Sequence, residues 1–207
     1  MTGQTGLFVS FEGIDGSGKS TQAKALAQRV TDHGRAALLT REPGGSDGAE
    51  AIRRLLVEGD PDRWSAETEL LLFNAARRDH LEKRIAPALA RGEVVITDRF
   101  ADSTRVYQGA TRGDLRATVD QLHTLMIGRE PDITIIIDVD PAIALTRGLA
   151  RKSGEDRFEE FGLGFQEKLR AGFLKLAADA RRCHLIDGNR GADEIAQDVW
   201  TLIRPQL

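Results

Sequence analysis

The sequence contains little cysteine, little proline and no long apolar segment. Its one cysteine, Cys183, cannot form a disulfide within the chain, so we expect a structural thiol in a reducing compartment. No apolar run approaches the roughly 18–20 residues that cross a bilayer, and residues 1–6 carry no basic region of the kind that begins a targeting signal. These absences argue against a disulfide scaffold and a membrane-spanning protein, and they favour a cytoplasmic one.

An excess of basic charge is also missing. The formal net charge is −3, whereas proteins that bind nucleic acids or membrane surfaces are usually basic. With 207 residues, of which 41% are hydrophobic and 29% charged, the chain has ordinary values for one globular domain. Any anion site must therefore be built locally, from individual arginines and lysines.

Short β-branched or apolar runs alternate with longer helical patterns along the chain. This alternation predicts an α/β fold with a mainly parallel, five-stranded sheet and helices on both of its faces. The expected strands are Leu7–Phe11, Ala36–Leu39, Val94–Thr97, Ile133–Asp138 and Cys183–Ile186.

Three helices can be placed from their spacing and end signals. One runs from the first loop to a stop at Gly34. Another covers about 67–91, where Pro87 should introduce a kink or a boundary. A third begins at Asp140 and Pro141, a favourable pair of cap and first-turn residues.

The segment 13–20 reads G-I-D-G-S-G-K-S and matches the phosphate-binding pattern G-x-x-x-x-G-K-[ST]. It follows the first expected strand and opens the first expected helix, which is the setting that this motif requires. Its glycines let backbone N–H groups turn toward phosphate oxygens at a helix N-terminus. Lys19 would add charge at the β- and γ-phosphates and Ser20 would bind Mg²⁺, so the pattern predicts a site for a nucleoside triphosphate.

Further polar segments lie where ligands of open α/β sheets bind, at the ends of expected strands. Asp98 is placed to reach Mg²⁺ or its water and Arg99 to hold a phosphate, unless the two form a simple surface pair. Residues 40–45, T-R-E-P-G-G, form a charged loop whose proline and glycines suggest a shaped backbone. Phe73 and Arg77 share a helix face and could meet a base, although a phenylalanine at this spacing is more often core.

Taken in order, these segments resemble bacterial thymidylate kinases over nearly the whole chain. The similarity rests on F-E-G-I-D-G-S-G-K-S-T, T-R-E-P-G-G, L-L-F-N-A-A-R, D-R-F-A-D-S-T-R-V-Y-Q-G and a D-R-F-E segment. The ordered set is far more specific than the phosphate loop alone. The resemblance implies a P-loop kinase fold in a single domain, conversion of dTMP to dTDP with ATP and Mg²⁺ for dTTP synthesis, and a homodimer.

The resemblance also implies roles for individual residues. Phe73 would stack on thymine, Arg77 would bond to the base and Tyr107 would crowd the 2′ position of the sugar. Asp15 would meet the sugar 3′-hydroxyl and the metal shell, and Arg99 would bind the acceptor phosphate. The implied ATP site comprises Gly13, Ile14, Asp15, Gly16, Ser17, Gly18, Lys19, Ser20, Thr21, Arg147 and Arg190; the acceptor site Asp15, Arg41, Glu42, Pro43, Phe73, Arg77, Arg99, Ser103, Thr104, Tyr107 and Gln108; and the metal site Asp15, Ser20 and Asp98.

Residues 147–164 combine basic residues with glycine and serine, and we expect a basic flap there, the LID of this family, in preference to an ordinary helix end and loop. Related kinases place a transition-state arginine either in the phosphate loop or in this flap. Gly16 and Ser17 stand where the loop arginine would be, so the flap should supply it. Aligned from its start, the flap gives Arg151, and aligned from its end it gives Lys152. The implied catalytic residues are Lys19, Arg99, Arg151 and Lys152.

Some alternatives stay open. Phe100 replaces the Tyr or His that usually follows Asp-Arg, so any hydrogen bond made there in relatives is in doubt. The absence of an N-K-x-D sequence weakens a GTPase-type switch without excluding it. A kinase for another nucleoside monophosphate is a closer rival. The apolar stripe of the long helices fits a dimer interface or a core equally well.

Overall fold

A computed structural model describes residues 5–60, 63–111, 115–149 and 162–207 of the chain. Five strands form one sheet in the order β2-β3-β1-β4-β5, and every neighbouring pair is parallel. The expected fold class is therefore confirmed. The strands are β1 (Leu7–Glu12), β2 (Ala37–Arg41), β3 (Val94–Asp98), β4 (Ile133–Asp138) and β5 (Cys183–Asp187).

The central strand β1 is buried along its whole length. Val9 pairs with Ile96 of β3 on one side and with Ile133 of β4 on the other. Helices cover both faces of the sheet, which is why these strands read as continuous apolar runs. Four strands extend beyond their expected carboxyl ends, and the added residues include Glu12, Arg41 and Asp98, all at the edge where a ligand would bind.

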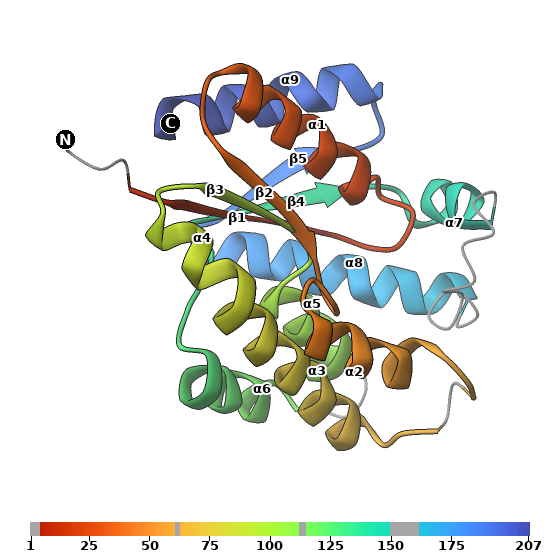
Figure 1. The fold of residues 1–207 in the computed structure, drawn as a ribbon. Coiled ribbons are helices and arrows are strands. Elements are labelled where there is room, and N and C mark those ends of the chain that lie inside the picture. The colour runs from red at the N-terminus through yellow and green to blue at the C-terminus, as the bar shows by residue number, and fades with distance from the viewer. Residues whose placement is uncertain (1–4, 61–62, 112–114, 150–161) are drawn as a thin grey trace.

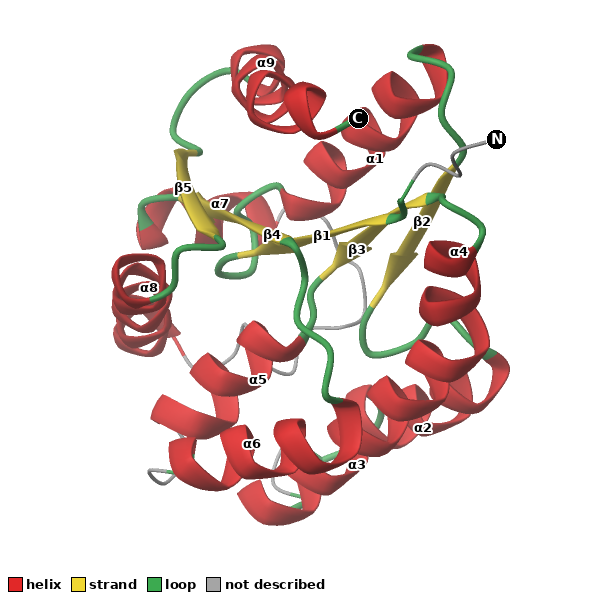
Figure 2. Cartoon of the chain, turned by 90° about the vertical axis from the view of Figure 1, so that its left-hand side faces the viewer, coloured by secondary structure: helices red, strands yellow, loops and turns green. Residues whose placement is uncertain are grey.

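Figures 1 and 2 show the layers. Helices α1 (Lys19–Asp32) and α9 (Ala192–Ile203) cover one face, and α5 (Ala101–Val106) and α8 (Gly162–Asp179) cover the other (Figure 2). Beyond that second face lie α2 (Asp47–Val57), α3 (Ala66–His80) and α6 (Arg116–Leu122) (Figures 1 and 2). The other elements are α4 (Ala86–Ala90), α7 (Pro141–Leu149), the π-helical segments η1 (Leu81–Ile85), η2 (Tyr107–Thr111) and η3 (His123–Ile127), and the 3₁₀ turn η5 (Arg204–Gln206).

The long helix expected over 67–91 consists of three consecutive pieces, α3, η1 and α4, which together cover 66–90. Ser65 caps its start by accepting a hydrogen bond from the backbone N–H of Thr68 at 3.2 Å. Pro87 lies in the first turn of α4, where its missing N–H costs little, and the π-helical segment directly precedes that turn. The boundary expected at Pro87 is therefore confirmed.

The other two helix predictions also agree with the structure. Gly34 follows α1 with φ at +88°, in the left-handed region that favours glycine. Asp140 caps α7, because its Oδ1 accepts a hydrogen bond from the Ala142 N–H at 2.8 Å. Residues 147–149 of the expected flap end α7 and residues 162–164 begin α8, while 150–161 lie outside the described residues. Within the described part of the chain, no helix is long and apolar enough to cross a membrane.

Candidate active site

The phosphate loop joins β1 to α1, as its pattern predicts. Gly16 has φ at +82°, and a Cβ there would lie 2.0 Å from the carbonyl oxygen of Ala144 in α7. Ser17 is buried, with 2% of its surface exposed. The close backbone contact at Gly16 and the burial of Ser17 leave little room for a long basic side chain at either position.

The start of α1 is left open to an anion. Gly18 precedes the helix in the left-handed conformation, and among the described residues no side chain caps the helix and no carboxylate lies in its first turn. Backbone N–H groups and the positive end of the helix dipole therefore favour phosphate. Lys19 Nζ donates to the Ile14 carbonyl oxygen at 2.7 Å, which holds the ammonium over the same loop. Burial and the nearby charge of Arg99 lower the pKa of Lys19 to about 8.

Ser20 and Asp98 bring oxygen donors together beside this loop. Ser20 Oγ donates a hydrogen bond to Asp98 Oδ2, so the first turn of α1 touches the carboxyl end of β3. Hard oxygen donors of this kind suit Mg²⁺, whose remaining positions are usually filled by water and substrate phosphates. The two residues fit the magnesium site expected from the sequence.

Arg99 is the centre of the next group. Its φ of +71° lies in the left-handed region, which is unusual for a side chain other than glycine and is found where the surrounding structure enforces it. Nη2 contacts Asp15 Oδ1 and donates to the Tyr107 hydroxyl at 3.2 Å, while Nη1 donates to Ser103 Oγ at 2.9 Å. The Tyr107 hydroxyl in turn donates to Asp15 Oδ2 at 2.9 Å. A single cluster thus joins the phosphate loop, the end of β3 and the α5–η2 segment.

The opposite charges of Asp15 and Arg99 keep both groups ionised in spite of their burial. Burial opposes ionisation of Asp15, but the charges of Arg99 and Lys19 outweigh it and hold the pKa of that carboxyl below its ordinary value. Burial likewise opposes the charge of Arg99, and the Asp15 carboxylate outweighs it, so the pKa of the guanidinium lies above its usual range. Burial, strengthened by Asp15, raises the pKa of the Tyr107 hydroxyl. Asp15 and Arg99 are therefore an ion pair at neutral pH, beside a neutral phenol.

Glu12 stabilises this cluster through hydrogen bonds with the residues that follow Arg99. The sequence analysis did not predict a role for it. The Phe100 N–H donates to Glu12 Oε1 at 2.8 Å and Ser103 Oγ donates to Oε2 at 2.5 Å. Glu12 is fully buried, and burial together with the charge of Asp102 raises its pKa to about 7. The side chain ties the strained turn at Arg99 to the end of β1.

A second arginine lies farther along the same wall. Arg77 of α3 is buried against Glu42, with 2.7 Å between Nε and Oε2, and its Nη2 donates to Thr104 Oγ1 at 2.9 Å. The guanidinium lies over the ring of Phe100, with 5.2 Å between its carbon and the ring centroid. Phe73, one turn earlier on α3, is half-buried and lines the same cavity. Phe100 itself packs edge-on against Phe8 at 5.0 Å, so its ring belongs to the core and supports Arg77 from below.

The loop after β2 is held by contacts from α2. Arg41 pairs with Glu50 at 3.3 Å, and Glu50 also accepts a hydrogen bond from the Gly45 N–H at 2.9 Å. Arg53 Nη1 donates to the Pro43 carbonyl oxygen at 2.5 Å, and the Glu42–Pro43 peptide bond is cis. The shaped backbone expected for residues 40–45 is therefore present.

These groups surround one cavity of about 690 Å³ at the carboxyl edge of the sheet. It brings together residues from the phosphate loop, the loop after β2, α3, and the segment from β3 to η2. Of the residues expected in the site, it is lined by Asp15, Gly16, Gly18, Lys19, Ser20, Arg41, Glu42, Pro43, Phe73, Arg77, Asp98, Arg99, Ser103, Thr104, Tyr107 and Gln108.

Other expected residues lie outside this lining. Gly13, Ile14 and Ser17 shape the loop from within, and Ile14 belongs to the core. Thr21 is exposed on α1. Arg147 donates to the Gly188 carbonyl oxygen at 3.3 Å and Arg190 pairs with Asp198, so both lie near the β5–α9 loop. Their roles toward ATP stay predictions, and Arg151 and Lys152 lie outside the described residues.

Fold and site together define a class. A parallel sheet with a P-loop after its first strand, and a cavity that joins this loop to a second cradle of arginines, is the arrangement of a P-loop kinase that transfers a phosphoryl group between two small molecules.

The comparisons with known proteins narrow this class. The sequence profile of the family described as "Thymidylate kinase" matches residues 11–199. A thymidylate kinase of Dinoroseobacter shibae is 76% identical over 95% of each chain, and one of Ruegeria pomeroyi is 63% identical over 98% of this chain and 97% of its own. The crystal structure of the thymidylate kinase from Ehrlichia chaffeensis matches with a TM-score of 0.77 at 36% identity, over 96% of this chain and 99% of that one. The chain belongs to the thymidylate kinase family.

Proposed function

We propose that the chain transfers the γ-phosphoryl group of ATP to dTMP, giving ADP and dTDP. One observation carries the proposal most directly. Arg99 and Asp15 form an ion pair that joins the phosphate loop to the acceptor cradle, so donor and acceptor phosphates would meet at this point. No covalent intermediate is needed, because positioning and charge neutralisation supply most of the catalysis in phosphoryl transfer.

The donor side would act mainly through Lys19 and the start of α1. The helix N-terminus offers N–H groups to the phosphates, and the ammonium is held within the same loop by the Ile14 carbonyl. A bound triphosphate would draw the ammonium from that carbonyl to its β- and γ-oxygens. The attraction grows as charge develops on the transferred group, which makes Lys19 more valuable in the transition state than in the ground state.

Mg²⁺ would be held by Ser20 and Asp98, with Asp15 near its shell, and would neutralise phosphate charge when bound. The adjacency of the Ser20 hydroxyl and the Asp98 carboxylate supports this assignment. The two Asp15 oxygens are engaged by Arg99 and Tyr107, which favours contact through water over direct ligation.

Acceptor choice would depend on the second half of the cavity. Phe73 offers a ring face for stacking, Arg77 offers hydrogen-bond donors to the base, and Thr104 lies beside that guanidinium. Tyr107 is held by hydrogen bonds with Asp15 and Arg99, so its ring has a fixed place at which to crowd a ribose 2′-hydroxyl. These contacts support dTMP over a ribonucleotide.

The flap would supply the missing transition-state cation. The crowding at Gly16 and Ser17 leaves little room for that cation in the phosphate loop, which supports a role for Arg151 or Lys152. Closure of the flap would also exclude water and so prevent hydrolysis of ATP.

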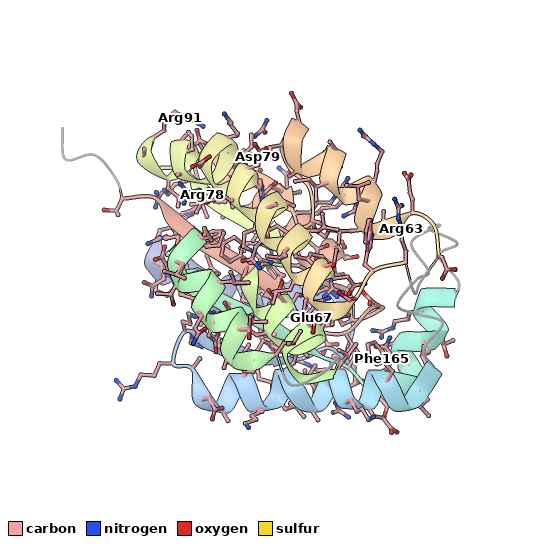
Figure 3. All side chains as sticks on the ribbon, turned by 90° about the horizontal axis from the view of Figure 1, so that it is seen from below. Arg63, Glu67, Arg78, Asp79, Arg91 and Phe165 are labelled. Carbon is pink, nitrogen blue, oxygen red and sulfur yellow. The ribbon has the colours of Figure 1, made fainter. Side chains whose placement is uncertain are left out.

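The protein would work as a cytoplasmic homodimer. Arg78 Nη1 donates to the Met126 carbonyl oxygen at 2.7 Å, so α3 and η3 lie side by side on the face that Figure 3 presents. Leu71, Leu125 and Met126 on these two elements are 59%, 75% and 52% exposed, an apolar group that a second copy would cover. Mass measurement in solution tests this: we expect a dimer, and Leu125→Glu should shift it toward monomer. A monomeric parent at micromolar concentration would contradict it.

The reaction is tested by coupling ADP release to NADH oxidation. We expect release that depends on dTMP and on Mg²⁺, with little turnover when either is omitted. Release that is equally fast without any acceptor would instead support a nucleotide switch or an ATPase.

A further inference from the structure

Behind Arg77 lies a chain of buried polar contacts that the proposed reaction does not use directly. Glu42 Oε2 accepts from Arg77 Nε at 2.7 Å, and Glu42 Oε1 lies 3.1 Å from His80 Nδ1. His80 Nε2 lies 2.7 Å from Thr40 Oγ1. The chain therefore runs from the end of β2, through a histidine on α3, to the guanidinium on the cavity wall.

The three innermost members of this chain are buried and contact one another. The side chains of Arg77 and Glu42 are 3% and 4% exposed, and His80 is not exposed at all. A carboxylate oxygen only accepts, so Nδ1 must carry a proton to bond to Glu42. The other ring nitrogen, Nε2, makes the second hydrogen bond, to the Thr40 hydroxyl.

Close packing fixes the imidazole in this orientation. Gly45 has φ at +88°, and a Cβ on it would lie 2.4 Å from both His80 Nε2 and Thr40 Oγ1. The backbone of the loop after β2 therefore packs directly against the His80 ring at Gly45. The carboxylate of Glu42 is held at both oxygens, one by the ring and the other by Arg77, and so it cannot rotate without breaking one of the two contacts.

These contacts leave one nitrogen of Arg77, Nη1, available to a ligand in the cavity. Its Nε and Nη2 are committed to Glu42, Thr104 and the Phe100 carbonyl oxygen. The described part of the chain gives Nη1 no hydrogen-bond partner, and Arg77 lines the cavity. A guanidinium donates only, so a fixed Nη1 suits the O4 acceptor of a thymine and opposes the N4 donor of a cytosine.

We propose that His80 is a positioning residue for acceptor recognition: through Glu42 it fixes Arg77, and this fixation maintains the preference for thymine over cytosine. The inference rests on the proposed function. Removal of the imidazole would leave Glu42 Oε1 buried without a partner, and the carboxylate would rotate or take up a proton to relieve this. Arg77 would then lose its fixed direction while the fold and the donor site stayed intact.

The test compares kcat/KM for dTMP and dCMP in three variants. His80→Leu removes both ring contacts, and we expect the dTMP-to-dCMP ratio to fall roughly tenfold, mainly through KM for dTMP, with KM for ATP unchanged. His80→Gln keeps one donor and one acceptor and should restore most of the ratio. Thr40→Val removes only the far end of the chain and should lower the ratio in the same direction by a smaller factor.

His184→Leu is the control. His184 is half-buried on β5, and it does not line the cavity that Arg77 faces. Loss of stability alone would lower the active fraction for both acceptors equally, so it would not change the ratio. A ratio that is unchanged in His80→Leu, or lowered equally in His80→Gln, would overturn the proposal; if His80→Leu does not fold, Thr40→Val and His80→Gln carry the same test. The acceptor preference of the parent tests the proposed function separately, so the two can fail independently.

Discussion

Glu12→Gln should change how stability depends on pH. Glu12 is fully buried between β1 and the turn at Arg99, and burial together with Asp102 raises its pKa from 4.5 to about 7, despite hydrogen bonds from Ser103 and Phe100. Below pH 4.5 the carboxyl is protonated in the folded and unfolded chains alike, and its titration contributes nothing to the difference. As pH rises from 4.5 toward 7, the unfolded chain loses this proton while the folded chain keeps it, so the free energy of unfolding falls. Above 7 both chains are ionised and the loss stays constant.

The magnitude follows from the two pKa values. A pKa unit corresponds to 1.36 kcal/mol, so the shift of Glu12 costs as much as about 3 kcal/mol of folding free energy at pH 8. Glutamine does not titrate, and any hydrogen bond that it loses to Phe100 or Ser103 is lost at every pH. The stability of the variant minus that of the parent should therefore rise between pH 5 and pH 8, whatever its absolute value.

Urea unfolding at pH 5, 6, 7 and 8 measures this difference. We expect it to rise by as much as about 3 kcal/mol with unchanged urea dependence, and we expect Glu58→Gln, at an exposed position after α2, to show a nearly constant difference. A Glu12→Gln difference that stays constant or falls with pH would refute the burial argument for this carboxyl.

Three further variants address the site. Lys19→Ala should lower turnover by roughly 10²–10³ with the fold retained, and a well-folded variant within a few-fold of the parent would remove Lys19 from this role. Tyr107→Ala should narrow the preference for deoxyribose over ribose in side-by-side rates, and an unchanged preference would show that another group crowds the 2′ position. Arg151→Ala should lower turnover more than ATP binding, by about 10³–10⁵-fold if this is the transition-state arginine, with Lys152→Ala as the partner measurement. Near-parent turnover in both single variants and in the double variant would contradict a catalytic role for these two flap residues, and Arg147 or Arg157 would then have to be tested.

The fold class and the five strands could be predicted from the sequence, because each strand reads as a short apolar run and β1, β3 and β4 are largely buried. The strand order could not, because it depends on pairings between residues far apart in the sequence. The phosphate loop could be predicted for a different reason: few backbone arrangements cradle phosphates, and this one demands glycines at fixed spacing. Strand ends were less certain. The pattern stops where apolar residues stop, whereas Glu12, Arg41 and Asp98 continue the ladder with polar side chains that serve the site.

Residues that position other side chains could not be identified from sequence patterns. Glu12 directly precedes the first glycine of the loop, and His80 lies three residues after Arg77 on α3. No sequence motif marks a buried glutamate or histidine as a positioning residue. Their partners come from the turn after β3 and from the end of β2, far away in the sequence. The resemblance to the family supplied the roles of Phe73 and Tyr107, which spacing alone left ambiguous with core positions.

The central claim is that this cavity phosphorylates dTMP. Its most direct test supplies the purified protein with Mg²⁺ and limiting ATP, in an equimolar mixture of dTMP, dUMP, UMP, dCMP, AMP and GMP, and identifies the diphosphates by mass spectrometry at early times. The account predicts that dTDP forms first and in large excess, and that the excess shrinks in Arg77→Ala, whose side chain reaches the cavity beside Phe73. Predominant formation of any other nucleoside diphosphate by the parent protein would contradict it.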